Sequence, residues 1–366
     1  MLLSEIVKVA PRYQRAIRID TDFGDTEALE GFICPESSKQ SLQQICGHIS
    51  KTGQCAFTWT GPYGCGKSSL AIALGAILKG NKDQRSKSMN FLGADLSQQV
   101  WGSLKPNQNG WFVLPLVGYR QQPHTAIIEG LIKNKLSKLN KKATEKEVLN
   151  ELLKIANKDQ KGGGLILLLD EMGKFLEHAA DQQKDIYFFQ ELAELASRSK
   201  GRLILIGILH QAFDQYAGSL TKESRDSWAK IQGRFIDIPI NVAGEEQIEL
   251  LSRAIINESI PNKHKSLSKT IGQLVLKLKP GVSNEIITFL TNSWPLHPVV
   301  SSLLGPISRR QFGQNQRSIF GFLNSAEPNG FQDFITNTED KHAIYSPTDL
   351  WEYLRSNLEP VILASS

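Results

Sequence analysis

The hydrophobic positions in the first two thirds of the chain alternate between short apolar runs and longer stretches with helical spacing. Continuous apolar runs, which are typical of strands buried on both faces, occupy Leu165–Leu169 and Leu203–Leu209. Shorter β-prone runs occupy Cys55–Thr60, Trp111–Val117 and Phe235–Ile240. Because strands and helices alternate along the chain, the pattern predicts an α/β fold with a parallel sheet flanked by helices.

Helical periodicity fills the intervals between these runs. The predicted helices are Ser37–Lys51, Leu70–Leu78, Thr125–Leu139, Thr144–Ala156, Ile186–Ser199 and Ser224–Ile231. A polar segment rich in Gln and Asn, Asn81–Asn109, is instead predicted to be loop with a short helix. Residues 31–242 are therefore expected to form one core, and the polar, irregular residues 1–30 an arm that leads into it.

Strand signals fade after Val242, and helical spacing takes over. The predicted helices are Glu245–Ile256, Thr270–Leu278, Asn284–Asn292 and Val299–Leu304. We expect residues 243–345 to form a helical lid domain. Residues 346–366 contain the helix-like stretch Thr348–Asn357 and are expected to begin a further helical segment that continues in a longer protein.

A glycine-rich loop follows the first predicted core strand and opens a helix. Its residues, Gly61, Pro62, Tyr63, Gly64, Cys65, Gly66, Lys67 and Ser68, fit the pattern G-x-x-x-x-G-K-[ST] in the strand–loop–helix context that this motif needs. Its backbone N–H groups and the helix N-terminus can cradle phosphates, and Lys67 brings a cation to the β- and γ-phosphates. Ser68 is expected to bind Mg²⁺. The next residue, Ser69, is expected to contact the nucleotide together with the loop. The alternative, a chance glycine turn, is disfavoured by the two matching flanks.

Two carboxylates, Asp170 and Glu171, follow the apolar run Leu165–Leu169 directly. The carboxyl end of a buried strand delivers side chains beside a phosphate site in this kind of sheet. We expect Asp170 to hold the Mg²⁺ shell and Glu171 to orient and polarise the water that attacks the γ-phosphorus. The alternative is that Glu171 only begins a helix, where acidic residues are common.

The next predicted strand ends in His210 and Gln211, where the γ-phosphate and the attacking water would lie. Either side chain could sense the γ-phosphate, and a histidine that caps the following helix is an equal alternative. This strand is predicted to lie between the strand of the phosphate loop and the strand of the acid pair. That order disfavours a P-loop kinase.

Composition indicates a folded protein, with 22% charged and 40% hydrophobic residues. Its four cysteines form no Cys-x-x-Cys pair, which favours reduced thiols and a cytoplasmic protein; they are Cys34, Cys46, Cys55 and Cys65. The N-terminus lacks the apolar centre of a signal peptide, and the longest apolar run is too short to span a membrane. Cys65 occupies a variable slot and is interpreted as a small filler.

The formal net charge of +5 permits an anionic partner without requiring one. A basic strip ends the predicted helix Thr125–Leu139 and consists of Lys133, Lys135, Lys138, Lys141 and Lys142. A solvated helix face explains the strip, and contact with DNA or RNA is the weaker alternative, because no aromatic residues are interleaved for base stacking.

Together, four features resemble the AAA+/STAND division of P-loop ATPases over about residues 31–325: Gly61–Ser68, Leu165–Glu171, His210 and Gly233–Phe235. The resemblance implies an additional-strand sheet followed by a helical lid. At His210 the sequence departs from this resemblance, because asparagine is more usual at that position in AAA+ ATPases.

The same resemblance assigns roles to arginines. In AAA+ proteins an arginine ahead of the fifth strand reaches the γ-phosphate held by a neighbouring subunit. Arg234 occupies the corresponding position in this sequence. The resemblance therefore implies a homo-oligomer. The alternative is a surface ion pair with Asp237 or Glu245. In such ATPases a lid arginine contacts the nucleotide, and the candidates here are Arg309, Arg310 and Arg317, with His297 a weaker one. An interdomain hydrogen-bonding patch would explain this cluster equally well.

Three further segments resemble the large ATPases of prokaryotic anti-phage defence systems, BREX-type ones among them. They are Asp170–Glu177, Pro295–Pro298 and Gln314–Ser318. That likeness implies an ATP-driven defence component with partner proteins. The sequence therefore predicts a cytoplasmic, Mg²⁺-dependent ATPase that rearranges an oligomer or a nucleic-acid-bound complex. The alternative is a nucleotide-gated scaffold that binds ATP or ADP and scarcely hydrolyses it.

Overall fold

The chain folds into two compact units. The computed structural model describes residues 2–13, 17–25, 27–29, 34–79, 82–107, 109–158, 163–182, 186–218, 220–309 and 319–365. The core unit consists of Ile17–Asn241, and the flanking unit combines Met1–Ala16 with Val242–Ser366. The segment interpreted from the sequence as an N-terminal arm is thus divided between the two units.

A five-stranded parallel sheet forms the centre of the core unit. Its strands are β2 (Ala56–Thr60), β3 (Phe112–Val117), β4 (Leu165–Asp170), β5 (Leu203–Leu209) and β6 (Ile236–Pro239). Their order is β3-β4-β5-β2-β6, so that β5 lies between β2 and β4. The predicted parallel sheet with an additional strand is therefore confirmed. Because the strands are parallel, the residues that follow β2, β5 and β4 meet at one edge of the sheet.

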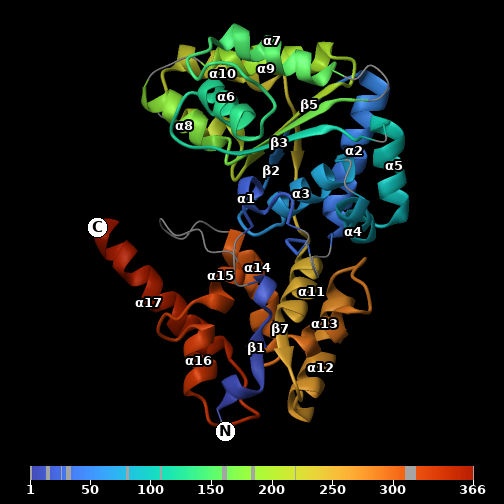
Figure 1. The fold of residues 1–366 in the computed structure, drawn as a ribbon. Coiled ribbons are helices and arrows are strands. Elements are labelled where there is room, and N and C mark those ends of the chain that lie inside the picture. The colour runs from blue at the N-terminus through green and yellow to red at the C-terminus, as the bar shows by residue number, and fades with distance from the viewer. Residues whose placement is uncertain are drawn as a thin grey trace. The chain divides into compact units, whose positions relative to one another are not determined.

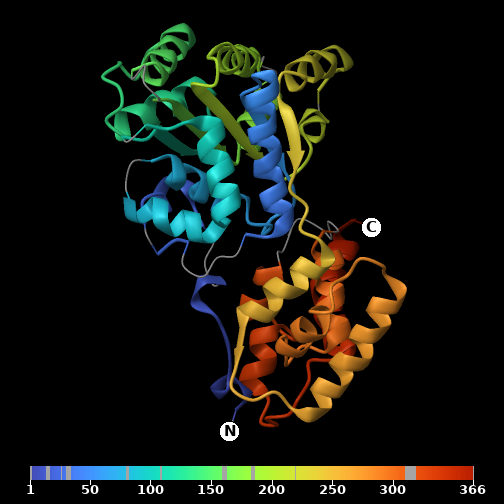
Figure 2. The ribbon, with the colours of Figure 1, turned by 90° about the vertical axis from the view of Figure 1, so that its right-hand side faces the viewer.

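Helices cover both faces of this sheet (Figures 1 and 2). One face carries α2 (Glu36–Thr52) and α3 (Lys67–Leu78), over which α4 (Lys82–Leu92) and α5 (Ala94–Leu104) pack. The opposite face carries α6 (Pro123–Lys133), α7 (Glu145–Ala156) and α9 (Tyr187–Arg198). The remaining short elements of this unit are α1 (Ile19–Asp22), α8 (Gly173–Asp181), η3 (Phe213–Ala217) and α10 (Lys222–Gln232).

The interpretation of residues 81–109 as mostly loop is wrong, because α4 and α5 occupy most of this segment. Leu92, Leu96, Val100 and Leu104 recur every four residues and are buried. Contacts between α5 and α2 bury this apolar stripe. The abundant Gln and Asn residues obscured a helical period that tertiary packing stabilises.

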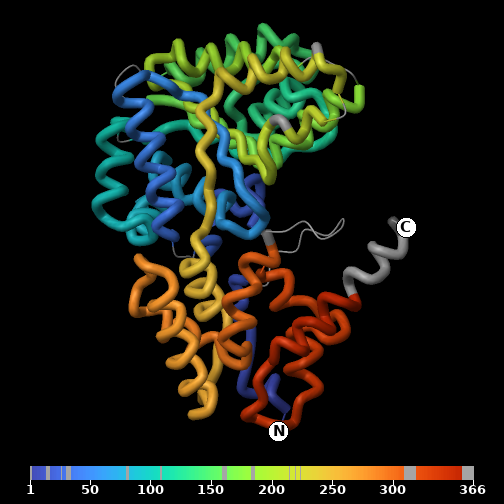
Figure 3. Tube along the Cα trace, turned by 180° about the vertical axis from the view of Figure 1, so that it is seen from behind, coloured from blue at the N-terminus to red at the C-terminus, as the bar shows by residue number. Residues whose placement is uncertain are grey.

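Helices dominate the flanking unit. They are α11 (Gly244–Ala254), α12 (Asn262–Leu278), α13 (Ile286–Asn292), α14 (Pro298–Arg309), α15 (Ile319–Asn324), α16 (Phe331–Asn337) and α17 (Pro347–Ser365). Two short strands, β1 (Val7–Val9) and β7 (Ile255–Asn257), pair antiparallel, and η1 (Leu3–Glu5) and η2 (Pro11–Tyr13) flank β1. The sequence analysis predicted no strand here and extended the first helix through Ile256. Figure 3 shows the N-terminal segment running among the later helices of this unit.

Candidate functional site

The glycine-rich loop joins β2 to α3 at the carboxyl edge of the sheet. Gly64 and Gly66 have φ angles of 77° and 82°, in the left-handed region that glycine adopts without strain. A Cβ atom at Gly61 would lie 2.3 Å from the carbonyl oxygen of Ile240, so that only glycine fits this close approach. The amide of Gly61 donates to Leu209 O at 3.3 Å. The loop is therefore fixed between the ends of β5 and β6.

Lys67 is the first residue of α3 and its side chain folds back over the loop. The residue is only 5% exposed. Its Nζ donates to Gly61 O at 2.6 Å and to Pro62 O at 2.8 Å, and lies 3.4 Å from Cys65 Sγ. These acceptors offset the cost of burying an ammonium group. The loop thus holds a buried cation at the N-terminus of a helix, an arrangement that attracts anions.

The two predicted metal ligands lie next to each other. Ser68 Oγ donates to Asp170 Oδ2 at 2.7 Å, although the two residues are 102 positions apart. Asp170 ends β4 and is 6% exposed. Burial raises the pKa of the Asp170 carboxyl, against which act the hydrogen bonds from Ser68 and the Glu171 amide and the charge of Lys67. A hydroxyl beside a carboxylate is a donor set that suits Mg²⁺.

Glu171 adopts a backbone conformation that non-glycine residues rarely take, with φ of 50°. Its neighbours fix this turn: Gly118 N donates to Asp170 O at 2.7 Å, and Met172 N donates to Ile208 O at 3.0 Å. Within the described part of the chain, no group donates a hydrogen bond to the Glu171 carboxylate. Burial and then the charge of Asp170 raise the pKa of Glu171, whereas Lys174 and Arg18 act in the opposite direction. A half-buried carboxylate with a raised pKa is suited to accept a proton.

His210 follows β5 and stacks on Tyr63 of the loop. The ring centroids are 3.5 Å apart and the planes differ by 18°. Both ring nitrogens of His210 are buried and have no hydrogen-bond partner among the described residues. Burial, reinforced by the charges of Lys67 and Lys174, lowers the pKa of His210 to about 3. The imidazole is therefore neutral at physiological pH. In this respect it is like the side chain of asparagine.

Comparisons with known proteins add a likeness of fold. No protein-family profile matches this sequence, and a search of curated proteins finds no similar chain. Among solved structures, the chain is similar to the ORC2 protein of Aeropyrum pernix, described as ADPNP–ADP complexes, with 12% identity, a TM-score of 0.38 and coverage of 72% of this chain and 70% of that one. It is also similar to PCH-2 of C. elegans, with 12% identity, a TM-score of 0.29 and coverage of 78% and 64%. At these values we draw no conclusion about activity from either.

Arg234 lies at the opposite edge of the sheet from the phosphate loop. It lies two residues before β6, which is parallel to β2, whereas the loop follows β2. The Arg234 side chain is 52% exposed and lies 3.5 Å from the carboxylate of Glu194 on α9. The predicted alternative partners are engaged elsewhere: Thr58 and Thr60 donate to Asp237, and Ser283 N donates to Glu245. The surface ion pair exists, but with a different acid.

The predicted lid arginines cannot be placed on the site. Arg310 and Arg317 lie outside the described residues, and Arg309 ends α14 with a side chain that is likewise outside them. His297 accepts a hydrogen bond from Val299 N at the start of α14. The neighbouring Trp294 is fully buried and donates to Ala343 O at 3.1 Å. This part of the cluster therefore packs the flanking unit.

Two residues at the site were not predicted from the sequence, and for Tyr63 of the predicted loop the stack on His210 was not predicted. Arg18 donates to the hydroxyl of Tyr119 at 2.9 Å, and its charge lowers the pKa of Glu171, but it lies in a segment without a pattern. Gly118 closely approaches the Glu171 backbone: a Cβ there would lie 2.3 Å from Glu171 O. These contacts arise only from the fold.

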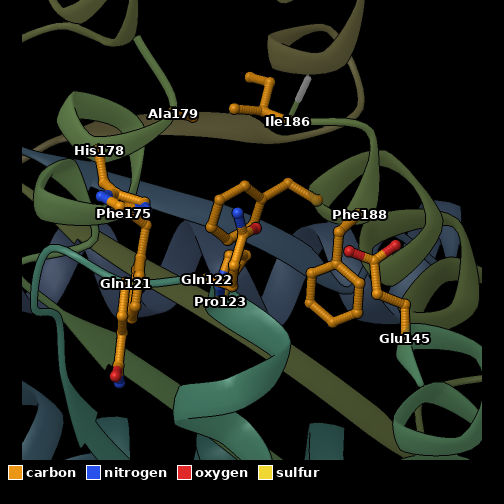
Figure 4. Close-up of a pocket in the computed structure, with 10 residues that line it drawn as sticks. Gln121, Gln122, Pro123, Glu145, Phe175, His178, Ala179, Ile186 and Phe188 are labelled. Carbon is orange, nitrogen blue, oxygen red and sulfur yellow. The ribbon is translucent and has the colours of Figure 1, made fainter. Parts of the chain in front are cut away.

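A small cavity lies near this edge of the sheet, between the start of α6, α8 and the start of α9. Phe175, Phe188 and Ile186 supply its apolar wall, with Gln121, Glu145 and His178 around it (Figure 4). Its volume of about 20 Å³ is enough for a water molecule but far too small for a nucleotide. The glycine loop, not this cavity, is therefore the candidate site.

Other sites are not evident in the part of the chain that the structure describes. Cys34, Cys46, Cys55 and Cys65 are all buried, and none of them forms a disulfide within the described part of the chain. No group of three or more His, Cys, Asp or Glu side chains is placed to hold a metal ion among the described residues. Within those residues, no helix is both long and apolar enough to cross a membrane.

Proposed function

We propose that this chain binds ATP together with Mg²⁺ and hydrolyses it. The observation that carries the proposal is the 2.7 Å hydrogen bond between Ser68 Oγ and Asp170 Oδ2. It joins the end of the phosphate loop to the acid pair, although each motif is recognised separately in the sequence. Loop, cation and two carboxylates at one sheet edge are the parts that phosphoryl transfer to water needs.

In this proposal each part has its own role. The loop amides from Tyr63 to Gly66 and that of Ser69 would surround the phosphates, and Lys67 would leave its loop carbonyls to neutralise the β- and γ-phosphates. Ser68 and Asp170 would hold Mg²⁺, which would neutralise charge on the phosphate oxygens. His210, a neutral ring with no partner among the described residues, would donate a hydrogen bond to the γ-phosphate or to the attacking water.

Glu171 activates the water. Its carboxylate is half-buried and accepts no hydrogen bond from a described residue, so that it is available to orient a water molecule and take its proton. As the water oxygen bonds to the γ-phosphorus, the bond to the β–γ bridging oxygen breaks and ADP leaves with that oxygen. The raised pKa of Glu171 makes it a better base than an exposed carboxylate.

A pair of substitutions tests the proposal. We expect Glu171→Gln to retain ATP binding, because the amide replaces only the proton acceptor, and to lose hydrolysis by on the order of a hundredfold or more. We expect Lys67→Ala to lose nucleotide binding, because the buried cation of the loop is removed. Calorimetric titration with ATP and steady-state phosphate release separate the two effects.

Two outcomes would contradict the proposal. Near-normal turnover by Glu171→Gln would make this residue a structural acid, and unchanged affinity in a folded Lys67→Ala variant would remove the loop from the site. If the wild type binds ATP tightly but releases no phosphate, the chain is instead a nucleotide-gated switch.

The wider setting of the activity is also part of the proposal. We propose a homo-oligomer, since Arg234 lies at the edge of the sheet away from its own loop. A role in prokaryotic anti-phage defence is supported by the sequence resemblance alone. A plaque assay that compares cells carrying the wild type and Lys67→Ala, each with its natural neighbouring proteins, tests it: equal phage sensitivity would exclude that role.

A further inference from the structure

The surface of α12 carries a one-sided distribution of charge. Between Glu258 and Glu285 there is no acidic residue, whereas five lysines occur, namely Lys263, Lys265, Lys269, Lys277 and Lys279. Their combined charge equals the formal net charge of the entire chain, +5, so the rest of the chain is neutral overall. We call these five residues the lysine face.

Helical geometry places the lysines on one side. With a rotation of 100° per residue, the four lysines within α12 fall in an arc of about 160°, and Lys263 and Lys277 are about 21 Å apart along the axis. All five are exposed. Ser266, Thr270 and Gln273 lie between them and are exposed as well. These hydroxyl and amide groups are the neutral side chains that commonly accompany lysines at phosphates.

The opposite side of α12 is fixed to its own unit. His264, Ser268 and Gly272 are buried. A Cβ at Gly272 would lie 2.5 Å from the Ile287 side chain, and His264 Nε2 lies 3.1 Å from Leu290 O. The helix therefore packs tightly on α13 and presents the lysine face outward from a rigid element.

Folding does not account for the lysine face. Several helix-surface cations elsewhere have acidic partners three or four residues away, as in Arg253 with Glu249, Arg198 with Glu194 and Arg355 with Glu352. Among the described residues, none of the five lysines forms an ion pair. Lys265 and Lys269 are four residues apart, a spacing at which like charges destabilise a helix by a few tenths of a kcal/mol.

We infer that the lysine face of α12 binds the phosphate backbone of double-stranded DNA without sequence preference. A duplex carries about one negative charge per 1.7 Å of axis, so a 21 Å face meets more phosphates than it has lysines. The major groove of B-DNA is about 12 Å wide and admits an α-helix between two phosphate rows. A-form RNA offers a deep, narrow major groove that does not.

A membrane surface fits this helix less well. Interfacial helices need a continuous apolar face, usually with aromatic residues. The apolar side of α12 is buried on α13, and the helix contains no aromatic residue. Leu274 and Leu278, 49% and 78% exposed, lie only at its C-terminal end.

The full-length chain without nucleotide tests this inference, so the result does not depend on the proposed ATPase. Fluorescence anisotropy measures binding to two 30-base-pair DNA duplexes of unrelated sequence at several KCl concentrations. We expect equal affinities for both. In the triple variant Lys265→Gln, Lys269→Gln and Lys277→Gln, affinity should fall at least on the order of tenfold, and the salt slope should decrease by about 0.9 for each lysine removed.

A second triple variant, Lys51→Gln, Lys146→Gln and Lys230→Gln, is the matched control, because these scattered, exposed lysines of the core unit give the same change in charge. We expect it to bind DNA like the wild type. Equal losses in both variants would show an effect of net charge alone. No binding by the wild type at physiological salt would overturn the inference. The inference would also be overturned if the wild type bound vesicles of anionic phospholipid instead of DNA and the α12 variant lost that binding.

Discussion

At the scale of single residues, His210 combines a stack on Tyr63 with a strongly lowered pKa. Burial, with the charges of Lys67 and Lys174, lowers the pKa of His210 to about 3. Tyr63 covers one face of the ring at 3.5 Å. The two charges that lower its pKa are those of Lys67 on α3 and Lys174 on α8. Burial and repulsion by these two cations thus both favour the neutral form of the imidazole.

We predict that Tyr63→Ala raises the pKa of His210 toward its ordinary value of 6.5, because solvent then reaches the ring, whereas Tyr63→Phe leaves it depressed. NMR titration of the histidine Cε1–H signals between pH 4 and 8 measures this, and the spectrum of His210→Asn identifies the signal. A wild-type His210 signal that titrates near pH 6.5 would contradict the prediction.

The same shift predicts the direction of the pH dependence of stability. His210 has a lower pKa in the folded than in the unfolded chain, so the unfolded chain binds a proton first as the pH falls below about 6.5. His210 therefore destabilises the fold progressively from about pH 6.5 down to about pH 3. Compared with wild type, His210→Asn should lose less stability over that interval in urea unfolding.

The residues that could be predicted from the sequence are those whose chemistry depends on neighbours in the chain. Lys67 and Ser68 follow the glycines directly, and Asp170 and Glu171 follow an apolar run, so local pattern indicated them. Arg18 and Gly118 reach the site through contacts between distant segments, as does the stack of Tyr63 on His210. One sequence without such contacts gives no reason to choose them.

At the scale of elements, the contact between the ends of β3 and β4 fixes the position of the acid pair. A Cβ at Gly118 would lie 2.3 Å from the carbonyl oxygen of Glu171 and 3.0 Å from its carbon. Both are backbone atoms, which cannot rotate away as a side chain could. The two strand ends would therefore have to separate.

We predict that Gly118→Ala destabilises the chain by about 1–3 kcal/mol and displaces Glu171, so that ATP hydrolysis falls at least on the order of tenfold while nucleotide affinity changes less. Gly47→Ala on α2 is the control, because nothing lies within 4 Å of its added Cβ, and this change should stabilise the helix by up to about 1 kcal/mol. Thermal unfolding and phosphate release measure both. Unchanged hydrolysis in Gly118→Ala would show that the strand ends do not set the catalytic geometry.

Elements were predictable where periodicity and burial coincide. All five core strands were placed within one or two residues, since each is an apolar run between helices. The strands β1 and β7 were missed because three-residue strands carry no periodic signal. Their pairing is decided by contacts some 250 positions apart, as the register Val7 with Asn257 shows.

At the scale of the molecule, the sheet separates Arg234 from its own phosphate loop. The loop follows β2 and Arg234 precedes the parallel neighbour β6, so about five residues of strand, or roughly 17 Å, lie between them. Arg234 therefore does not reach a nucleotide bound to its own loop, and the proposed contact with a γ-phosphate would have to be made in a neighbouring copy. Its ion pair with Glu194 is exposed and therefore weak.

We predict that Arg234→Ala and Glu171→Gln are each inactive in hydrolysis, and that mixing the two variants recovers some activity, because one mixed interface joins an intact arginine to an intact acid. Phosphate release measured over a range of protein concentrations, with assembly followed by light scattering, provides the check. Specific activity should rise with concentration. Full activity of a monomer, or a mixture that co-assembles but stays inactive, would leave Arg234 as a surface ion-pair residue.

The pairing of β1 with β7 also has a consequence for synthesis on the ribosome. Translation makes β1 roughly 250 residues before its partner β7, which at about 5–20 residues per second is a wait on the order of ten seconds to a minute. The strands of the core sheet all lie within that interval and can pair while β1 waits. β1 is thus made first but is paired only after β7 has been made. Until then Val7 and Val9 lie in an unpaired segment that a chaperone or another nascent chain can bind.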